Sequence, residues 1–258
     1  MRAVGEHPVP AGPLAVRWLA HDVGRVRAGA LHRVRLELEN AGAAAWRDAK
    51  LSYHWLDPLG NAVLWDGVRT DLPAAEPGHR LGVEAAMRGP IPPGRYRLAF
   101  DLVLEHRYWF AEVGNTPLDL EVRVEPRIER RLAAVGASNS LLLAQKEELV
   151  PIEEAEAVAH VAPGVEPAPD WSRRVLDAHQ EGYAVVGGSI DAGRRRTLAP
   201  WAPGVGRVPG FAHPLVCPSV VTGIEPVWAD PVAGLPAAGP PAEEPGVFDG
   251  RIVIRLRD

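Results

Sequence analysis

The chain has 258 residues, 47% of them hydrophobic, which is enough for one large or two ordinary domains with packed cores. Its formal net charge is −5, and neither half of the chain is basic, which argues against non-specific binding to nucleic acid or to an anionic membrane surface. Cys217 is the only cysteine, so the chain has no intrachain disulfide and no zinc site made of cysteines alone.

The distribution of apolar residues also bears on membrane insertion and secretion. No run approaches the ~20 apolar residues of a membrane-spanning helix. The first sixteen residues, MRAVGEHPVPAGPLAV, contain no continuous apolar stretch of the kind that secretion signals carry. We therefore expect no membrane insertion and a cytoplasmic location.

Residues 1–12 are expected to form a flexible tail, and residues 13–126 show the alternation of apolar and polar side chains that half-buried strands have. Segments rich in Pro, Gly, Asp and Asn separate the runs and favour turns. This pattern predicts an antiparallel β-sandwich with seven or eight strands. The expected strands are 14–19, 31–40, 50–56, 61–66, 81–87, 94–105, 107–112 and 117–124.

The same alternation assigns the side chains of the core, because successive residues of a strand point to opposite faces. We expect one buried face in each of three long strands, with Trp46 joining them. The predicted core residues are Leu31, Val34, Leu36 and Leu38, then Leu51, Tyr53 and Trp55, and then Tyr96, Leu98, Phe100 and Leu102.

Three segments of this half resemble the immunoglobulin-like accessory domains of bacterial glycosyltransferases and other polysaccharide-synthesis proteins. They are ENAGAAAW (39–46), LSYHWLDPLGNAVLWDG (51–67) and PPGRYRLAFDLV (92–103). The shared features are an Asn-x-Gly turn before Trp46, a strand that ends in Asp57-Pro58, and a Pro-Gly-x-Tyr-x-Leu entry into a late strand. The resemblance implies an immunoglobulin-like sandwich, and a carbohydrate or a glycan-synthesis enzyme as its partner.

Tryptophans in this half allow two interpretations. Trp is heavily buried on average, so most of these rings fill the core, but an exposed indole can also stack on a sugar ring. Trp65 and Trp109 each neighbour a turn and a charged residue, and we expect them to be the exposed pair. The candidate ligand-binding residues are therefore Trp65, Trp109, Arg107 and Asp66. For Tyr96 we expect a structural hydroxyl that bonds to the backbone, as in a tyrosine corner.

Residues 127–258 show a different pattern, which predicts a smaller α/β domain that is partly irregular and rich in Pro and Gly. Over 128–149 we expect helical pieces, or a helix and an irregular connector. A strand is expected over 156–163, a helix from about Trp171 to Gln180 with Asp170 as its N-cap, and a strand over 183–190. The remainder from 192 is expected to be irregular, with an exposed loop over 234–246 and a closing strand over 250–256.

Within this half, PAPDWSRRVLDAHQEGYAVVGGSI (167–190) resembles part of the family 2 glycosyltransferases. In that family two aspartates before this segment hold a divalent cation on the sugar nucleotide, and such a cation prefers oxygen ligands. Here the corresponding stretch, 160–167, has Glu166 as its only acid. We therefore interpret this half as a degenerate relative without a cofactor; the alternative is a metal site that combines Glu166 with Asp170 or Asp191.

Other groups in this half have a structural and a functional interpretation. Gly187 and Gly188 fit a close approach between strands better than a phosphate site, since no glycine-rich fingerprint opens a helix there. His213 and Cys217 resemble a cysteine nucleophile with its base, but nothing in the sequence tunes the thiol, which favours a buried inert Cys. The run Arg194–Arg196 is expected to be a solvated surface rather than a phosphate clamp.

Three hypotheses for function remain. The first is a non-catalytic, carbohydrate-associated accessory protein. The second is an active glycosyltransferase that uses a sugar nucleotide, and convergence of Glu166, Asp170 and Asp191 in one pocket would favour it. The third is a structural subunit that docks onto a separate enzyme through its Pro-rich surface.

Overall fold

A computed structural model describes residues 1–135, 145, 147, 149–161, 165–191, 205–206, 215–223 and 244–256. The chain divides into two compact units, Met1–Glu125 and Pro126–Asp258. Each unit has its own apolar core.

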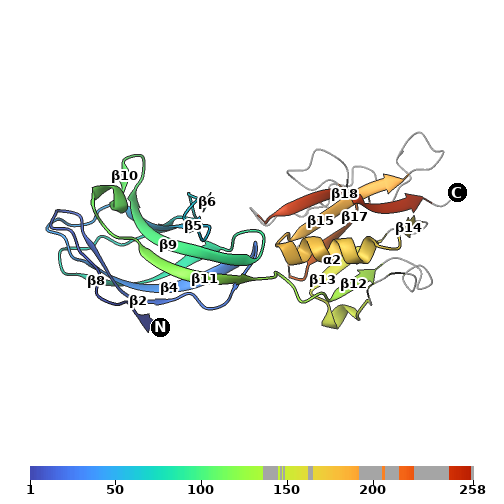
Figure 1. The fold of residues 1–258 in the computed structure, drawn as a ribbon, viewed down its shortest axis with the longest axis horizontal. Helices are drawn as coiled ribbons and strands as arrows, with labels where there is room; N and C mark the ends of the chain where they lie inside the picture. The colour runs from blue at the N-terminus through green and yellow to red at the C-terminus, as the bar shows by residue number, and fades with distance from the viewer. Residues whose placement is uncertain are drawn as a thin grey trace. The chain divides into compact units, whose positions relative to one another are not determined.

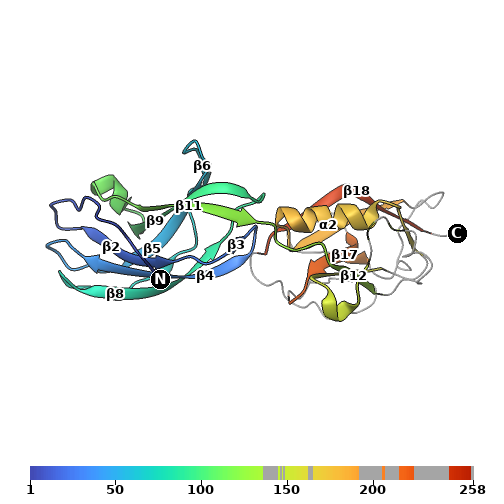
Figure 2. The ribbon, with the colours of Figure 1, turned by 60° about the horizontal axis from the view of Figure 1, so that its bottom comes forward.

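The first unit is a sandwich of two sheets. One sheet has the order β1-β2-β4-β8, which are Arg2–Ala3, Val16–Asp22, Leu31–Asn40 and Arg80–Arg88. The other has the order β3-β11-β9-β5-β6, which are Val26–Arg27, Leu118–Glu125, Gly94–Leu104, Ala49–Leu56 and Ala62–Leu64. On this second sheet, β7 (Thr70–Asp71) pairs with β5, and β10 (Tyr108–Trp109) pairs with β9. In Figure 2, β4 and β8 run along one side of this unit, and β9 and β11 run along the other.

The pairing of these strands is that of an immunoglobulin-like fold. The long strands pair antiparallel, and the short strand β3 pairs parallel with the end of β11. Together with the single α-helix among the residues of the second unit that the structure describes, this confirms the predicted mainly β fold with a small α part.

The core of the sandwich consists of the inward residues of facing strands. Almost all of the predicted core side chains are buried: Val34, Leu36, Leu38, Trp46, Leu51, Tyr53, Trp55, Leu98, Phe100 and Leu102. Leu31 was assigned wrongly and is 53% exposed, because it lies an even number of residues before Arg33 and Arg35 and so shares their outward face. Tyr96 is half-buried, and its hydroxyl donates to the carbonyl oxygen of Pro92 at 2.7 Å, the bond expected of a tyrosine corner.

Two segments of the first unit differ from the sequence expectation. In place of a strand over 107–112, β10 stops at Trp109 and the 3₁₀ helix η1 (Phe110–Val113) follows. The turn carries the Phe110 ring into the core, where its centroid lies 5.9 Å from that of Trp46. Residues 1–12, where a flexible tail is expected, include β1, which pairs with the end of β2.

The second unit contains one mixed sheet in the order β12-β13-β17-β15-β18-β14, with β16 (Val205–Gly206) on β17. In that order the strands are Leu132–Val135, Ala157–His160, Leu215–Val221, Val185–Asp191, Gly246–Leu256 and Val165–Pro167. The 3₁₀ helix η2 (Ile152–Glu154) precedes β13, and the helix α2 (Trp171–Glu181) lies along one face of the sheet (Figure 1). Trp171, Val175 and Leu176 of α2 are buried against this sheet.

The expected strand–helix–strand unit is present, but its strands are not neighbours. β13 and β15 both pair antiparallel with β17, which lies between them. The expected helix over 128–149 is wrong for residues 132–135, which form β12 and pair parallel with β13. Leu132 and Ala133 are buried there, so tertiary pairing overrides the helical preference of this stretch. Residues 136–144 and 234–243 lie outside the described residues.

Gly188 lies at a close approach between β15 and β18. A Cβ atom at this position would lie 2.1 Å from the carbonyl oxygen of Ile252, and the register of the two strands shifts between Gly188 and Ser189. This close approach of two backbones is the structural interpretation given to the paired glycines.

Replacing Gly188 with alanine is therefore expected to lower the free energy of unfolding of the second unit by about 1–3 kcal/mol, because the backbone of β18 must move. Faster amide hydrogen exchange in residues 183–191, measured by mass spectrometry, checks this. Gly82 is the matched control, since a Cβ there meets no atom within 4 Å. Equal exchange in the two variants would contradict the steric explanation.

Candidate functional site

An aromatic cluster covers the outer face of β5. Tyr53 and Trp55 point into the core, so His54 between them points outward. The side chain of His54 is nevertheless only 3% exposed, because the chain after β6 folds back over it. The fold-back is held by Gly67, whose N–H donates to the carbonyl oxygen of Tyr53 at 3.0 Å. A Cβ at Gly67 would lie 2.6 Å from that oxygen, so glycine allows this close approach.

Two tryptophan rings enclose His54. The Trp65 ring stacks on the imidazole with centroids 4.1 Å apart and planes inclined by 26°. The Trp109 ring, from β10, meets the imidazole edge-on at 4.3 Å. Trp65 is 52% exposed, and Trp109 is half-buried. The cluster therefore presents one large indole surface to solvent, supported from behind by two other rings.

Arg69 fixes the far side of this cluster. Its guanidinium lies 4.7 Å from the centroid of Trp109, which is a cation–π geometry. The same group donates to Asp66 at 2.8 Å and to Glu105 at 2.9 Å, and also to Ser52 Oγ at 2.7 Å. Burial opposes the charge of Arg69, but the hydrogen bonds and charges of Asp66 and Glu105 outweigh it and raise its pKa. Arg69 is thus a fixed cation that orders the platform.

His54 is a neutral support rather than an acid or base. Burial lowers its pKa, and this effect is larger than the opposing effects of the Trp65 carbonyl and the Asp66 carboxylate. Its Nδ1 contacts the carbonyl oxygen of Trp65, so Nδ1 carries the proton and donates. The imidazole is therefore uncharged at neutral pH and presents a flat apolar surface to the Trp65 ring.

The structure brings together three of the four candidate residues and leaves one apart. Trp65, Trp109 and Asp66 belong to the cluster. Arg107 is exposed in the turn before β10, and among the described residues its side chain has no ion pair or ring contact with the cluster. The cation of the site is Arg69, which sequence reasoning missed together with His54. Strand alternation places His54 outward between the core residues Tyr53 and Trp55, and this pattern could have identified His54 as a candidate site residue.

The candidate metal ligands of the second unit are spread over three elements. In the backbone register Glu166 of β14 and Asp191 of β15 both align with Arg255, on the strand that separates them. The Asp170 carboxylate accepts from Arg174 Nε at 2.7 Å, and this bond lowers its pKa. Among the described residues no group of three or more His, Cys, Asp or Glu side chains is placed to hold a metal ion.

A histidine and a serine also meet inside the second unit. His179 Nε2 lies 2.8 Å from Ser219 Oγ, and His179 Nδ1 lies 2.8 Å from the carbonyl oxygen of Tyr183. Both side chains are 0% exposed, so a substrate has no access to this pair. The bond to Ser219 instead ties α2 to β17, and the bond to Tyr183 joins α2 to the segment that follows it. His213 and Arg194–Arg196 lie outside the described residues, as does the side chain of Cys217.

No protein-family model matches the chain, and no curated protein matches it. Parts of solved structures do. The C-terminal domain of Wzt is similar over 45% of this chain and 76% of its own, with 9% identity and a TM-score of 0.32. A β-glucosidase from Listeria innocua is similar over 42% of this chain and 15% of its own, with 13% identity and a TM-score of 0.28. The yjhA protein from Bacillus subtilis is similar over 48% of this chain and all of its own, with 15% identity and a TM-score of 0.28.

These similarities cover less than half of the chain and only a small part of the β-glucosidase. Some of the similar structures are named for action on sugars, including a β-glucuronidase from glycoside hydrolase family 2. The glycosyltransferase resemblance of residues 167–190 finds no support among these structures. Within the described residues, no helix is long and apolar enough to cross a membrane.

Proposed function

We propose that this chain is a non-catalytic, carbohydrate-associated accessory protein, and that its sandwich binds a neutral part of a glycan on the exposed face of Trp65. The observation that carries the proposal is an indole that is 52% exposed yet held in place from behind by the stacked ring of His54. A rigid indole loses little conformational entropy when a sugar ring stacks on it, and the apolar C–H face of a pyranose suits its π-surface.

Polar groups at the edge of the ring suit the hydroxyls of a sugar. Asp66 follows Trp65 directly, and its carboxylate is anchored by Arg69 at 2.8 Å while the side chain stays largely exposed. One stacked ring contributes on the order of 1 kcal/mol beyond its buried area, so we expect weak, roughly millimolar binding. Weak affinity for a single site fits an accessory protein that meets a polymer or acts beside a glycan-synthesis enzyme.

The Trp65→Ala variant tests the proposal. Because half of the ring is already in solvent, its loss should change the free energy of unfolding by about 1 kcal/mol or less. Binding to maltohexaose or cellohexaose is followed by NMR, through the Trp65 indole N–H in the unchanged protein and through the backbone amides of β5 and β9 in both proteins. The amide shifts that the sugars cause in the unchanged protein should be lost in the variant.

Leu59→Ala is the matched control, because Leu59 is an exposed apolar residue of the same hairpin outside the ring cluster. The control should bind the sugars as the unchanged protein does. If both variants lose binding equally, the site is a general apolar surface and not a platform at Trp65. If the unchanged protein shifts no indole signal with any neutral sugar, the proposal is wrong.

A further inference from the structure

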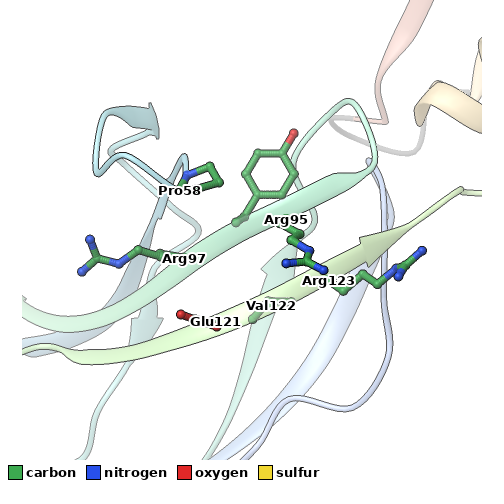
Figure 3. Close-up of a pocket in the computed structure, with 7 residues that line it drawn as sticks. Pro58, Arg95, Arg97, Glu121, Val122 and Arg123 are labelled. Atoms are coloured by element: carbon green, nitrogen blue, oxygen red, sulfur yellow. The ribbon is translucent and has the colours of Figure 1, made fainter.

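A groove with basic walls lies on the outer face of β9 and β11. It has a volume of about 380 Å³, and Figure 3 shows its lining side chains, which come from these two strands and from the turn after β5. The lining residues are Pro58, Arg95, Tyr96, Arg97, Glu121, Val122 and Arg123.

Arg95 and Arg123 form the basic end of this groove. They are directly opposite each other in the register of β9 and β11, and both side chains are exposed. Like charges in directly opposed positions destabilise a strand pair. In the described part of the chain neither guanidinium has an ion pair, whereas Arg97 on the same strand pairs with Asp119. The lining also includes one carboxylate, Glu121, but it is opposite Arg97 in the register, so Arg95 and Arg123 face each other as two like charges.

A second hollow adjoins the groove and is lined by both basic and acidic residues. It has a volume of about 520 Å³ and shares Glu121, Val122 and Arg123 with the groove, and its other charged residues are Arg2, Asp22 and Arg25. Arg25 is already bound to Glu125 at 2.6 Å. Of the three arginines that line the groove, Arg97 is paired with Asp119, which leaves Arg95 and Arg123 to bind an external anion. A planar guanidinium binds carboxylate or phosphate with two hydrogen bonds.

The groove and the aromatic cluster share one face of one sheet. His54 is opposite Ala99 on β9, and residues of β9 at intervals of two point to the same side. Arg97 and Arg95 precede Ala99 on that side, so Arg95 is four residues nearer the start of β9. At about 3.4 Å for each residue, the basic pair lies roughly 14 Å from the row of the cluster. An oligosaccharide of a few units can cover both.

From this geometry we infer that Arg95 and Arg123 form an anion subsite, and that the glycan bound by the sandwich is acidic, with carboxylate or phosphate groups on its sugars. The inference rests on the proposed function, because it places the neutral face of one sugar on Trp65 and an anionic group of another in the groove. An anion bound between the two guanidiniums would offset their repulsion. The carboxylate or phosphate of the ligand therefore supplies the negative charge for this pair.

The test compares acidic and neutral oligosaccharides of equal length. The probes are the hexamer of galacturonate, a phosphorylated mannohexaose and maltohexaose, titrated into the full chain by calorimetry or NMR. We expect tighter binding of one or both acidic probes, and a loss of that preference at high salt. The acidic probe that binds tighter identifies the anion as carboxylate or phosphate.

The double variant Arg95→Gln with Arg123→Gln should weaken acidic binding about tenfold or more, because charge-assisted hydrogen bonds are lost, and leave maltohexaose unchanged. The control, Arg33→Gln with Arg35→Gln, removes the same charge from exposed side chains of β4, in the other sheet. Equal losses in both double variants would assign the effect to net charge and overturn the subsite.

The remaining outcomes separate the two proposals. Equal binding of acidic and neutral hexamers, abolished by Trp65→Ala, keeps the platform and overturns the anion subsite. Acidic binding that depends on Arg95 and Arg123 but is unaffected by Trp65→Ala supports the subsite and overturns the platform. Absence of binding to every probe overturns both.

Discussion

Replacing Trp55 with alanine is expected to lower the free energy of unfolding of the first unit by about 3–5 kcal/mol. The indole is 0% exposed, and its ring meets that of Tyr96 edge-on at 6.1 Å between centroids. Its Nε1 donates to the carbonyl oxygen of Arg88 at 2.8 Å, on the facing sheet. Truncation leaves both a cavity between the sheets and a carbonyl without this donor, and each is costly in a packed interior.

Hydrogen exchange in the full chain measures this change unit by unit. Amides of β5 and β9 should lose protection in Trp55→Ala, while amides of α2 should not. Trp65→Ala is the matched comparison, since it removes the same side chain ten residues later from a surface position. Similar losses of protection in the two variants would contradict the division of these tryptophans into one in the core and one on the surface.

Lowering the pH from 7 to 4 is expected to remove roughly 3 kcal/mol from the stability of the second unit through His179 alone. Burial lowers the pKa of His179 to about 4, the positive charge of Arg127 acts in the same direction, and the bond to the Tyr183 carbonyl opposes them. The unfolded chain takes up this proton near pH 6.5, whereas the folded chain stays neutral until about pH 4. The stabilisation is therefore complete above pH 6.5 and is lost as the pH falls to about 4.

Denaturant unfolding at a series of pH values, with hydrogen exchange to separate the units, measures this dependence. His179→Gln should be less stable at pH 7 and should show a flatter profile between pH 4 and 6.5. An unchanged slope in the variant would show that other groups cause the acid sensitivity.

The free energy of unfolding of the first unit is expected to change less between pH 7 and pH 4, because His54 and Asp101 act in opposite directions. The lowered pKa of His54 makes acid destabilising. Burial raises the pKa of Asp101 to about 6, so the stabilisation from its protonated form is present below about pH 3.8 and is lost as the pH rises through 6.

The strands of the sandwich could be predicted because local patterns determine them. Alternation over 31–40 and 94–105 matches β4 and β9 within one residue at each end. The failures have tertiary causes. Phe110 ends β10 early by turning into the core against Trp46, and Leu132 joins a sheet through β13, which follows some 25 residues later. No local pattern contains those partners.

The candidate site divides in the same way. Exposure of Trp65 follows from its neighbours in the sequence, since it comes just before a charged residue and a glycine. The role of Arg69 could not be predicted from its sequence neighbours, because its partners Glu105 and Trp109 belong to another hairpin. Arg95 and Arg123 are 28 residues apart, and only the register of β9 and β11 makes them opposite neighbours.

The position of β18 within its sheet determines when the second unit can be completed during synthesis. β18 lies between β15 and β14, so residues 246–256 join two strands that are made much earlier. The sandwich is self-contained within residues 1–125 and has all its strands while the later part of the chain is still being translated. Until residues 246–256 are available, β15 lacks its partner β18 and keeps an unpaired edge, which includes Val185 and Val186, two residues that are buried in the folded unit. A nascent chain in that state is open to strand addition by another copy, and to chaperones that bind such edges.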